Sequence, residues 1–144
     1  MPRSKIFLPD VNVWVARTSG RHVHAAACRI WLDSLDQDQV MFCRVTQMGL
    51  LRLLTSESVM GSEVLSQRDA WKAYATILAD ARTGFAYEPP TLEDEWRKLT
   101  TSGRPKPKTW TDAYLAAFAR SSEMQMVTLD RGVLQLDPNA LLLS

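Results

Sequence analysis

The sequence predicts an α/β fold with a mostly parallel central sheet and helices on both faces. Apolar segments of strand length alternate with segments of helical spacing along the chain, and this order produces a parallel sheet covered by helices. The run Ile6-Phe7-Leu8 is apolar at consecutive positions, as in a strand buried on both faces. The 144 residues, 46% of them hydrophobic, suit one core, so we expect a single domain over residues 1–144.

The first half of the chain supplies two of the predicted strands and three of the predicted helices. We expect strands at 5–9 and 40–43, and helices at 12–18, 23–36 and 46–55. In the second helix an apolar stripe is expected from Ala26, Ile30 and Leu35, together with Trp31. The third helix carries Leu50, Leu51, Leu53 and Leu54 as core or partner surface, and a polar segment follows it.

The second half continues the alternation. Helical spacing runs through residues 66–82, with Ser66 as a plausible cap and Gly84 as the break. A strand is expected at 85–87, a short helix begins at Thr91, and the prolines of residues 103–108 indicate a loop. The pattern ends with a helix at 110–121 and a strand at 124–129, which leads into Asp130-Arg131-Gly132.

Composition excludes several classes of protein. No apolar run is long enough to span a membrane, and the first ten residues lack the apolar centre of a signal peptide, so we expect a cytoplasmic protein without membrane contact. Cys28 and Cys43 lie in apolar surroundings far apart in sequence, which indicates core thiols and not a disulfide or a zinc site. The net charge of +1 leaves the partner open.

Three acidic residues occupy comparable places. Asp10 ends the first strand, Asp130 follows the strand at 124–129, and Asp112 lies where a loop becomes a helix. The carboxyl ends of parallel strands open onto one crevice, where ligands bind. Three carboxylates there would repel one another unless a cation neutralised them, and oxygen ligands suit Mg²⁺ or Mn²⁺. The three acids therefore predict a metal site.

Each acid also has a purely structural explanation. Asp112 could cap its helix, because acids favour that end. Asp130 could be a turn residue, with Gly132 supplying a positive φ, and Asp10 could form an Asx turn. The three residues together, at one crevice, favour the metal site over these separate explanations.

Four stretches of the chain resemble the ordered motifs of PIN-domain ribonucleases, specifically toxins of the VapC type. They are Asp10-Val11-Asn12-Val13-Trp14, residues 46–55, residues 111–117, and Thr128-Leu129-Asp130-Arg131-Gly132. The resemblance implies a PIN-like three-layer α/β/α sandwich that cleaves RNA with Mg²⁺ or Mn²⁺. It also implies a VapB-type antitoxin as partner, and we expect a homodimer.

The resemblance assigns roles by position. Asp10, Asp112 and Asp130 take the acidic, metal-binding positions, and Asn12 and Thr128 fall at the polar positions that would orient them. The family usually has Glu where this chain has Gln47; the amide could offer a carbonyl oxygen to a metal or orient a water, but it brings no charge. The expected reaction is phosphodiester hydrolysis by a metal-bound water.

The loop before Asp112 is a candidate RNA contact. Arg104, Lys106 and Lys108 would bind phosphates, and Trp110 would stack on a base; an ordinary solvated loop is the alternative. Two other functions stay open at this point. The first, suggested by Gln47, is a non-catalytic PIN-like module that binds RNA or an antitoxin. The second is a small-molecule phosphohydrolase, although Asn12 stands where such an enzyme would need a second Asp.

Overall fold

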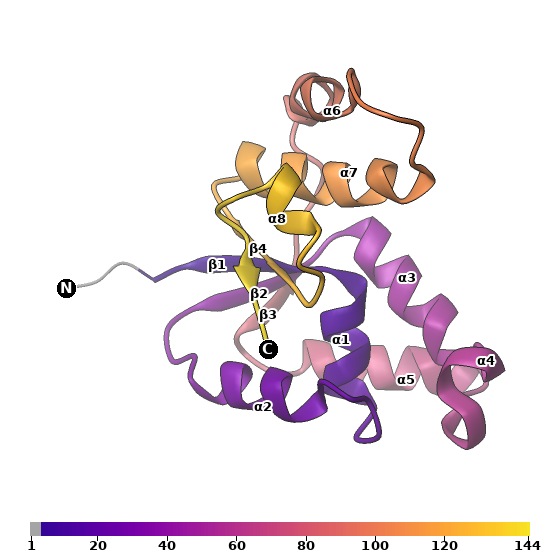
Figure 1. Ribbon diagram of the computed structural model, residues 1–144. Helices are drawn as coiled ribbons and strands as arrows, with labels where there is room; N and C mark the ends of the chain where they lie inside the picture. Colours follow the sequence, from indigo (N-terminus) through magenta and orange to yellow (C-terminus); the bar gives the residue numbers. More distant parts are fainter. Residues whose placement is uncertain (1–3) are drawn as a thin grey trace.

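A computed structural model describes residues 4–144 and contains a five-stranded sheet in the order β3-β2-β1-β4-β5, with every neighbouring pair parallel. The predicted α/β class is confirmed, and the described sheet is wholly parallel (Figure 1). The strands are β1 (Ile6–Pro9), β2 (Gln39–Phe42), β3 (Thr83–Phe85), β4 (Gln125–Thr128) and β5 (Leu141–Leu142).

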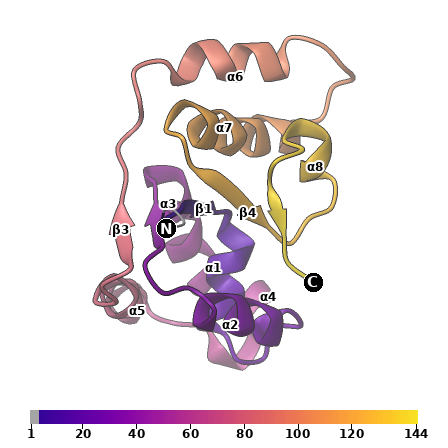
Figure 2. The ribbon, with the colours of Figure 1, turned by 90° about the vertical axis from the view of Figure 1, so that its left-hand side faces the viewer.

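Helices cover both faces of the sheet, as Figures 1 and 2 show. One group consists of α1 (Val11–Thr18), α2 (Ala25–Asp33), α3 (Arg44–Leu54), α4 (Glu57–Met60), a 3-10 turn (Gly61–Glu63) and α5 (Gln67–Leu78). The other group consists of α6 (Leu92–Thr100), α7 (Pro107–Ser121) and α8 (Val133–Leu136). In Figure 2, α6 lies outside α7 and away from the sheet.

The core has two parts, one on each face. Phe7 belongs to the part that also contains Trp14 and Leu50, whereas Leu8 belongs to the part with Phe118 and Met126. Successive side chains of a strand point to opposite faces, so the central strand β1 is buried on both, as its apolar run predicts. Cys28 and Cys43 are buried free thiols, as expected.

The pairing of β1 with β4 brings the end of one strand beside the end of the other. Pro9 faces Val127, and the backbone N–H of Asp10 donates to the Val127 carbonyl at 2.8 Å. Pro9 donates no ladder bond, but it is the last residue of β1, and the register with β2 extends only to Phe7 and Val40. Asp10 is thereby fixed at the carboxyl end of the sheet.

Three local predictions are wrong. The buried face of α2 is Ala25, Cys28 and Trp31, whereas Ile30 is 71% exposed. The helix was predicted to start two residues earlier, and its true start turns the apolar stripe by part of a turn. Gly84 does not break a helix but lies inside β3, where Met41 lies 3.2 Å from the position that a Cβ would take.

The third correction concerns the start of α7. The two prolines predict a loop as far as Lys108, but Pro107 is the first residue of α7, a position where the missing N–H costs nothing and the fixed φ suits the helix. Lys108 is therefore helical and not part of the loop.

The Ser66 cap is confirmed, since its side chain accepts from the Asp69 N–H at 3.1 Å. Among residues 4–144, no helix combines the length and the apolar character needed to cross a bilayer.

Candidate active site

Asp10 links the end of β1 to the start of α1. Its side chain is almost fully buried, and Oδ1 accepts from the Val13 N–H at 3.3 Å as the N-cap of α1. The Asx-type role that the sequence allowed is therefore present. A capping bond engages only one of the two carboxylate oxygens, and at this length it is weak.

Thr128 holds the second oxygen of Asp10. Its hydroxyl donates to Asp10 Oδ2 at 2.6 Å. The Thr128 hydroxyl oxygen in turn accepts from the backbone N–H of Asp130 at 3.0 Å. Thr128 is completely buried at the end of β4. Thr128 thus bridges the carboxylate of Asp10 and the backbone of Asp130.

Asp112 lies inside α7 and not at its beginning. The helix starts at Pro107, so Asp112 is beyond the first turn and does not cap it, which removes the structural explanation that the sequence left open. Lys108 and Asp112 are four residues apart and share one face of the helix. The half-buried Asp112 therefore faces the same solvent-filled space as Lys108.

Asp130 forms a turn and an ion pair. Its Oδ1 accepts from the Gly132 N–H at 2.8 Å, and its Oδ2 pairs with the Lys108 ammonium. The turn that the sequence allowed is present, but Gly132 has a φ of −63° and not the expected positive value. The glycine instead avoids crowding, because a Cβ there would lie 3.2 Å from Asp130 Oδ1.

Electrostatics join these groups into one cluster. Burial, and to a lesser degree the charge of Asp112, raises the pKa of Asp10 above its usual value. Burial likewise raises the pKa of Asp112, with Asp130 contributing in the same direction. The Lys108 hydrogen bond lowers the pKa of Asp130, and the Asp130 bond raises that of Lys108, with the charges of Asp112 and Asp10 adding to the rise. Asp112 thus acts on Asp10, Asp130 acts on Asp112, and all three carboxylates act on Lys108.

The donor set fits a hard divalent cation, although the carboxylates are not drawn together into a ligand cluster. Asp112 and Asp130 line an open cleft of about 460 Å³ that also contains Lys106 and Lys108. Within residues 4–144, no three His, Cys, Asp or Glu side chains lie close enough to bind one ion as they stand. The pKa values of Asp10 and Asp112 are nevertheless raised, and carboxylates of this kind are the oxygen ligands that Mg²⁺ and Mn²⁺ prefer.

Gln47 is engaged by a cation of the chain. The side chain is buried in the first turns of α3, and Oε1 accepts from Arg44 at 2.6 Å. The Arg44 guanidinium in turn lies 4.7 Å from the centre of the Phe85 ring, and burial raises the pKa of Tyr74, which Gln47 and Arg44 both act to lower. No hydrogen bond found in the described chain connects Gln47 with the three acids. Arg44 and Tyr74 were not predicted, because nothing in their sequence surroundings indicates a polar partner.

Asn12 contributes through its backbone. Its side chain is exposed on α1 and has no hydrogen bond with another described residue, but its N–H faces the Asp10 carboxylate. The orienting role that the sequence gave to the amide is thus filled, in this structure, by the main chain of the first turn.

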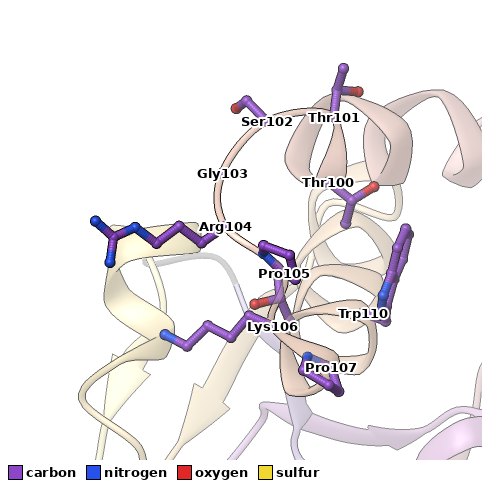
Figure 3. Close-up of a pocket in the computed structure, with 10 residues that line it drawn as sticks. Thr100, Thr101, Ser102, Gly103, Arg104, Pro105, Lys106, Pro107 and Trp110 are labelled. Atoms are coloured by element: carbon purple, nitrogen blue, oxygen red, sulfur yellow. The ribbon is translucent and has the colours of Figure 1, made fainter.

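The four predicted RNA-binding residues are divided between the loop before α7, with Arg104 and Lys106, and the first turn of α7, with Lys108 and Trp110. Lys108 lies with the acids. Figure 3 shows Arg104 and Lys106 extending to one side of the helix, while Trp110 lies on the other. Trp110 is 57% exposed and packs edge-to-face on Trp96 of α6, with ring centres 6.2 Å apart.

Comparison with known proteins places this geometry in context. A family model described as PIN domain matches residues 7–137. Ribonuclease VapC41 of Mycobacterium tuberculosis (strain ATCC 25618 / H37Rv) is 45% identical over 135 residues, which are 90% of this chain and 92% of the relative. Ribonuclease VapC38 of the same strain is 30% identical, over 90% of this chain and 88% of the relative.

Solved structures share the fold at lower identity. The crystal structure of Mycobacterium tuberculosis VapC20, described as a Sarcin-Ricin loop cleaving toxin, has a TM-score of 0.67 at 16% identity and covers 92% of this chain and 95% of its own. VapBC-1 from nontypeable Haemophilus influenzae has the same TM-score and identity and covers 95% and 96%.

Proposed function

This chain belongs to the PIN domain family and is a ribonuclease toxin of the VapC type, and from that premise we propose that its activity depends on Mg²⁺ or Mn²⁺ held by Asp10, Asp112 and Asp130. The observation that carries the proposal is the arrangement of the three acids at the carboxyl end of the sheet: Thr128 bonds both the Asp10 carboxylate and the Asp130 backbone, and Asp130 shares a cleft with Asp112. An ion bound there would lower the pKa of its bound water and would stabilise the negative charge that develops at the phosphate.

The chain's own residues would divide the work. Thr128 fixes the orientation of the Asp10 carboxylate through its 2.6 Å bond. Asp112 offers a half-buried carboxylate that no other described side chain engages by a hydrogen bond. Asp130 would accept a proton or orient a water after its ion pair with Lys108 has broken. Gln47 would assist only if its side chain broke the hydrogen bond with Arg44 and turned to the site.

The test compares wild-type protein with Asp10→Asn, and with Asp94→Asn on the exposed face of α6 as a matched control. Wild type and Asp94→Asn should cleave RNA with Mn²⁺ or Mg²⁺ and stop in EDTA, whereas Asp10→Asn should lose at least 100-fold in rate, as expected for a misplaced catalytic group. Calorimetry with Mn²⁺ gives a second readout, in which Asp10→Asn should bind more weakly. Undiminished cleavage by Asp10→Asn would sink the assignment.

A non-catalytic role is the second candidate, and one observation favours it. Asp130 and Gln47 are each engaged by a cation of the chain itself, Lys108 and Arg44. If purified wild-type protein binds RNA in Mn²⁺ but leaves it intact over hours, this second role replaces the first.

Partners follow from the same family premise. We expect a VapB-type antitoxin, because one structural neighbour is described as a toxin-antitoxin complex from Klebsiella pneumoniae and another as VapBC-1, and we also expect a homodimer. Co-expression with the small reading frame beside this one, followed by light scattering, would check both. RNA and antitoxin would be met in the cytoplasm, which fractionation of cells can test.

A further inference from the structure

We propose that Trp110 holds an unpaired RNA base on the face of α7 opposite the carboxylates, so that the substrate is a single strand that bends around the start of this helix. The inference rests on the proposed ribonuclease function and adds a base-binding position to it. Asp112 and Trp110 are two residues apart in α7, which places them about 200° apart around the helix axis. One nucleotide cannot touch both, so the contact with Trp110 is made by a neighbouring nucleotide.

Trp110 is exposed yet held in place. The Trp96 indole N–H donates to the Trp110 carbonyl at 3.0 Å, and the Trp96 ring packs edge-to-face against both Trp110 and Tyr114. Trp110 itself stays more than half exposed to solvent. A fixed, exposed indole is the kind of surface on which a base stacks with little loss of side-chain freedom.

Three neighbouring hollows connect this indole with the acids. A hollow of about 420 Å³ lies between Trp96, Arg97 and Trp110. It shares Thr100, Thr101 and Trp110 with a second hollow of about 400 Å³ on the loop before α7, drawn in Figure 3. That one shares Gly103, Arg104 and Lys106 with the cleft containing Asp112 and Asp130. The surface is therefore recessed without a break from Trp110 to the carboxylates.

Charge and backbone shape suit a phosphate chain along this path. Arg104 and Lys106 lie in the middle hollow, and neither forms an ion pair with another residue in 4–144. Gly103 has a φ of +107°, a value that favours glycine and lets the loop turn back towards α7. The two cations can neutralise phosphates between the base on Trp110 and the phosphate at the acids.

The required bend excludes a regular duplex. A paired A-form helix is stiff and keeps its bases stacked inside, whereas a single strand or loop can turn sharply and expose a base. The predicted substrate is thus an unpaired stretch of a few nucleotides. A protein segment inserted against Trp110 is the competing occupant, and the experiment separates the two.

The test measures RNA binding in Asp10→Asn protein with Mn²⁺ present, so that no RNA is cut. Trp110→Ala in this background should weaken binding of a fluorescent single-stranded oligonucleotide at least fivefold, and Trp110→Phe should retain most of the affinity. The control is Trp71→Ala on α5, where a tryptophan with similar exposure (55%) lies far along the chain; its affinity should not change. Fully annealed RNA of the same sequence should bind at least fivefold more weakly than the single strand.

Salt dependence separates stacking from charge. Arg104→Ala with Lys106→Ala should reduce the log–log salt slope by about 1.4, at roughly 0.7 per phosphate contact, whereas Trp110→Ala should leave the slope unchanged. Unchanged affinity in Trp110→Ala, or equal binding of duplex and single strand, overturns the proposal. So does a Trp110→Ala protein that binds RNA normally but no longer binds its antitoxin, which would assign the indole to a protein partner. Cleavage is not measured in this experiment, so a result against Trp110 leaves the nuclease assignment untouched. Conversely, a wild-type protein that does not cleave RNA would not explain a loss of binding that is specific to Trp110→Ala.

Discussion

Lys108 is the residue whose position matters most for metal binding. Its ammonium pairs with Asp130, and the charges of Asp112 and Asp10 also raise its pKa. A cation of the chain itself therefore stands among the carboxylates that we propose as metal ligands. A divalent ion entering the site would have to displace this ammonium or share the carboxylates with it.

Removing that charge should tighten metal binding. In Lys108→Met the aliphatic stem stays and the charge goes, so we expect Mn²⁺ to bind up to about fivefold more tightly, because an ion pair as exposed as this one (63% and 38%) contributes at most about 1 kcal/mol. Lys106→Met, two residues away and without an ion pair in the described chain, is the control and should change less. Calorimetry in the absence of RNA gives both values. Equal or weaker binding in Lys108→Met would mean that the lysine does not compete with the ion.

Position along the chain identified the acids but not their partners. Asp10, Asp130 and Thr128 follow strand ends, and parallel strands bring such ends together, so their proximity could be predicted. The pairing of Gln47 with Arg44, or of Lys108 with Asp130, depends on side-chain rotamers and on the helix start at Pro107. Nothing in a local sequence pattern specifies those.

At the level of elements, the crossing of α1 and α3 positions the start of α1. A Cβ on Gly49 would lie 2.6 Å from Cγ2 of Val11, and Val11 directly follows Asp10. The branched side chain of valine has little freedom to move aside. Gly49 therefore permits the close approach of the two helices that carry Asp10 and Gln47 at their N-terminal ends.

Gly49→Ala should destabilise the protein by about 1–3 kcal/mol, because the overlap with Val11 outweighs the roughly 1 kcal/mol that alanine gains in a helix. In a Val11→Ala background the overlap disappears, and the same substitution should stabilise by up to about 1 kcal/mol. Urea unfolding of the wild type, both single variants and the double variant gives the four free energies of unfolding. The same sign in both backgrounds would show that the contact does not set the helix spacing.

Element boundaries were predictable where one signal dominates and not where two compete. Ser66 before an amphipathic run identified the start of α5 correctly. At Pro107 two rules compete, because proline breaks the interior of a helix but is favoured at its first position. The structure follows the second rule. The two-residue strand β5 and the single turn of α8 are too short to show a period, so only the tertiary pairing of Leu141 with Val127 reveals the strand.

For the whole molecule, the two parts of the core share the strand β1, which contributes Phe7 to one and Leu8 to the other. Neither part can be dismantled without exposing apolar surface of the same strand to water. The two layers of helices are therefore coupled through the sheet, and the single domain over residues 1–144 stays a prediction that unfolding can test.

We accordingly expect residues 1–144 to unfold in one cooperative transition. Tryptophan fluorescence reports on Trp14 and Trp31 of the first core and also on Trp96 and Trp110 of α6 and α7. It should change in a single step, at the same urea midpoint as far-UV circular dichroism. The slope should lie at about 1–3 kcal/mol per molar urea. Midpoints that differ beyond error would reveal two separately stable units.

In the proposed site, the bond from the Thr128 hydroxyl to Asp10 also bears on when during synthesis that site can be complete. Asp10 and Thr128 are 118 residues apart in the chain, and contacts so distant in sequence form slowly. A nascent chain that stops short of β4 carries the first carboxylate without the threonine that orients it and without Asp130. Until β4 has been translated, the growing protein lacks part of the proposed site, so it should leave its own message uncut.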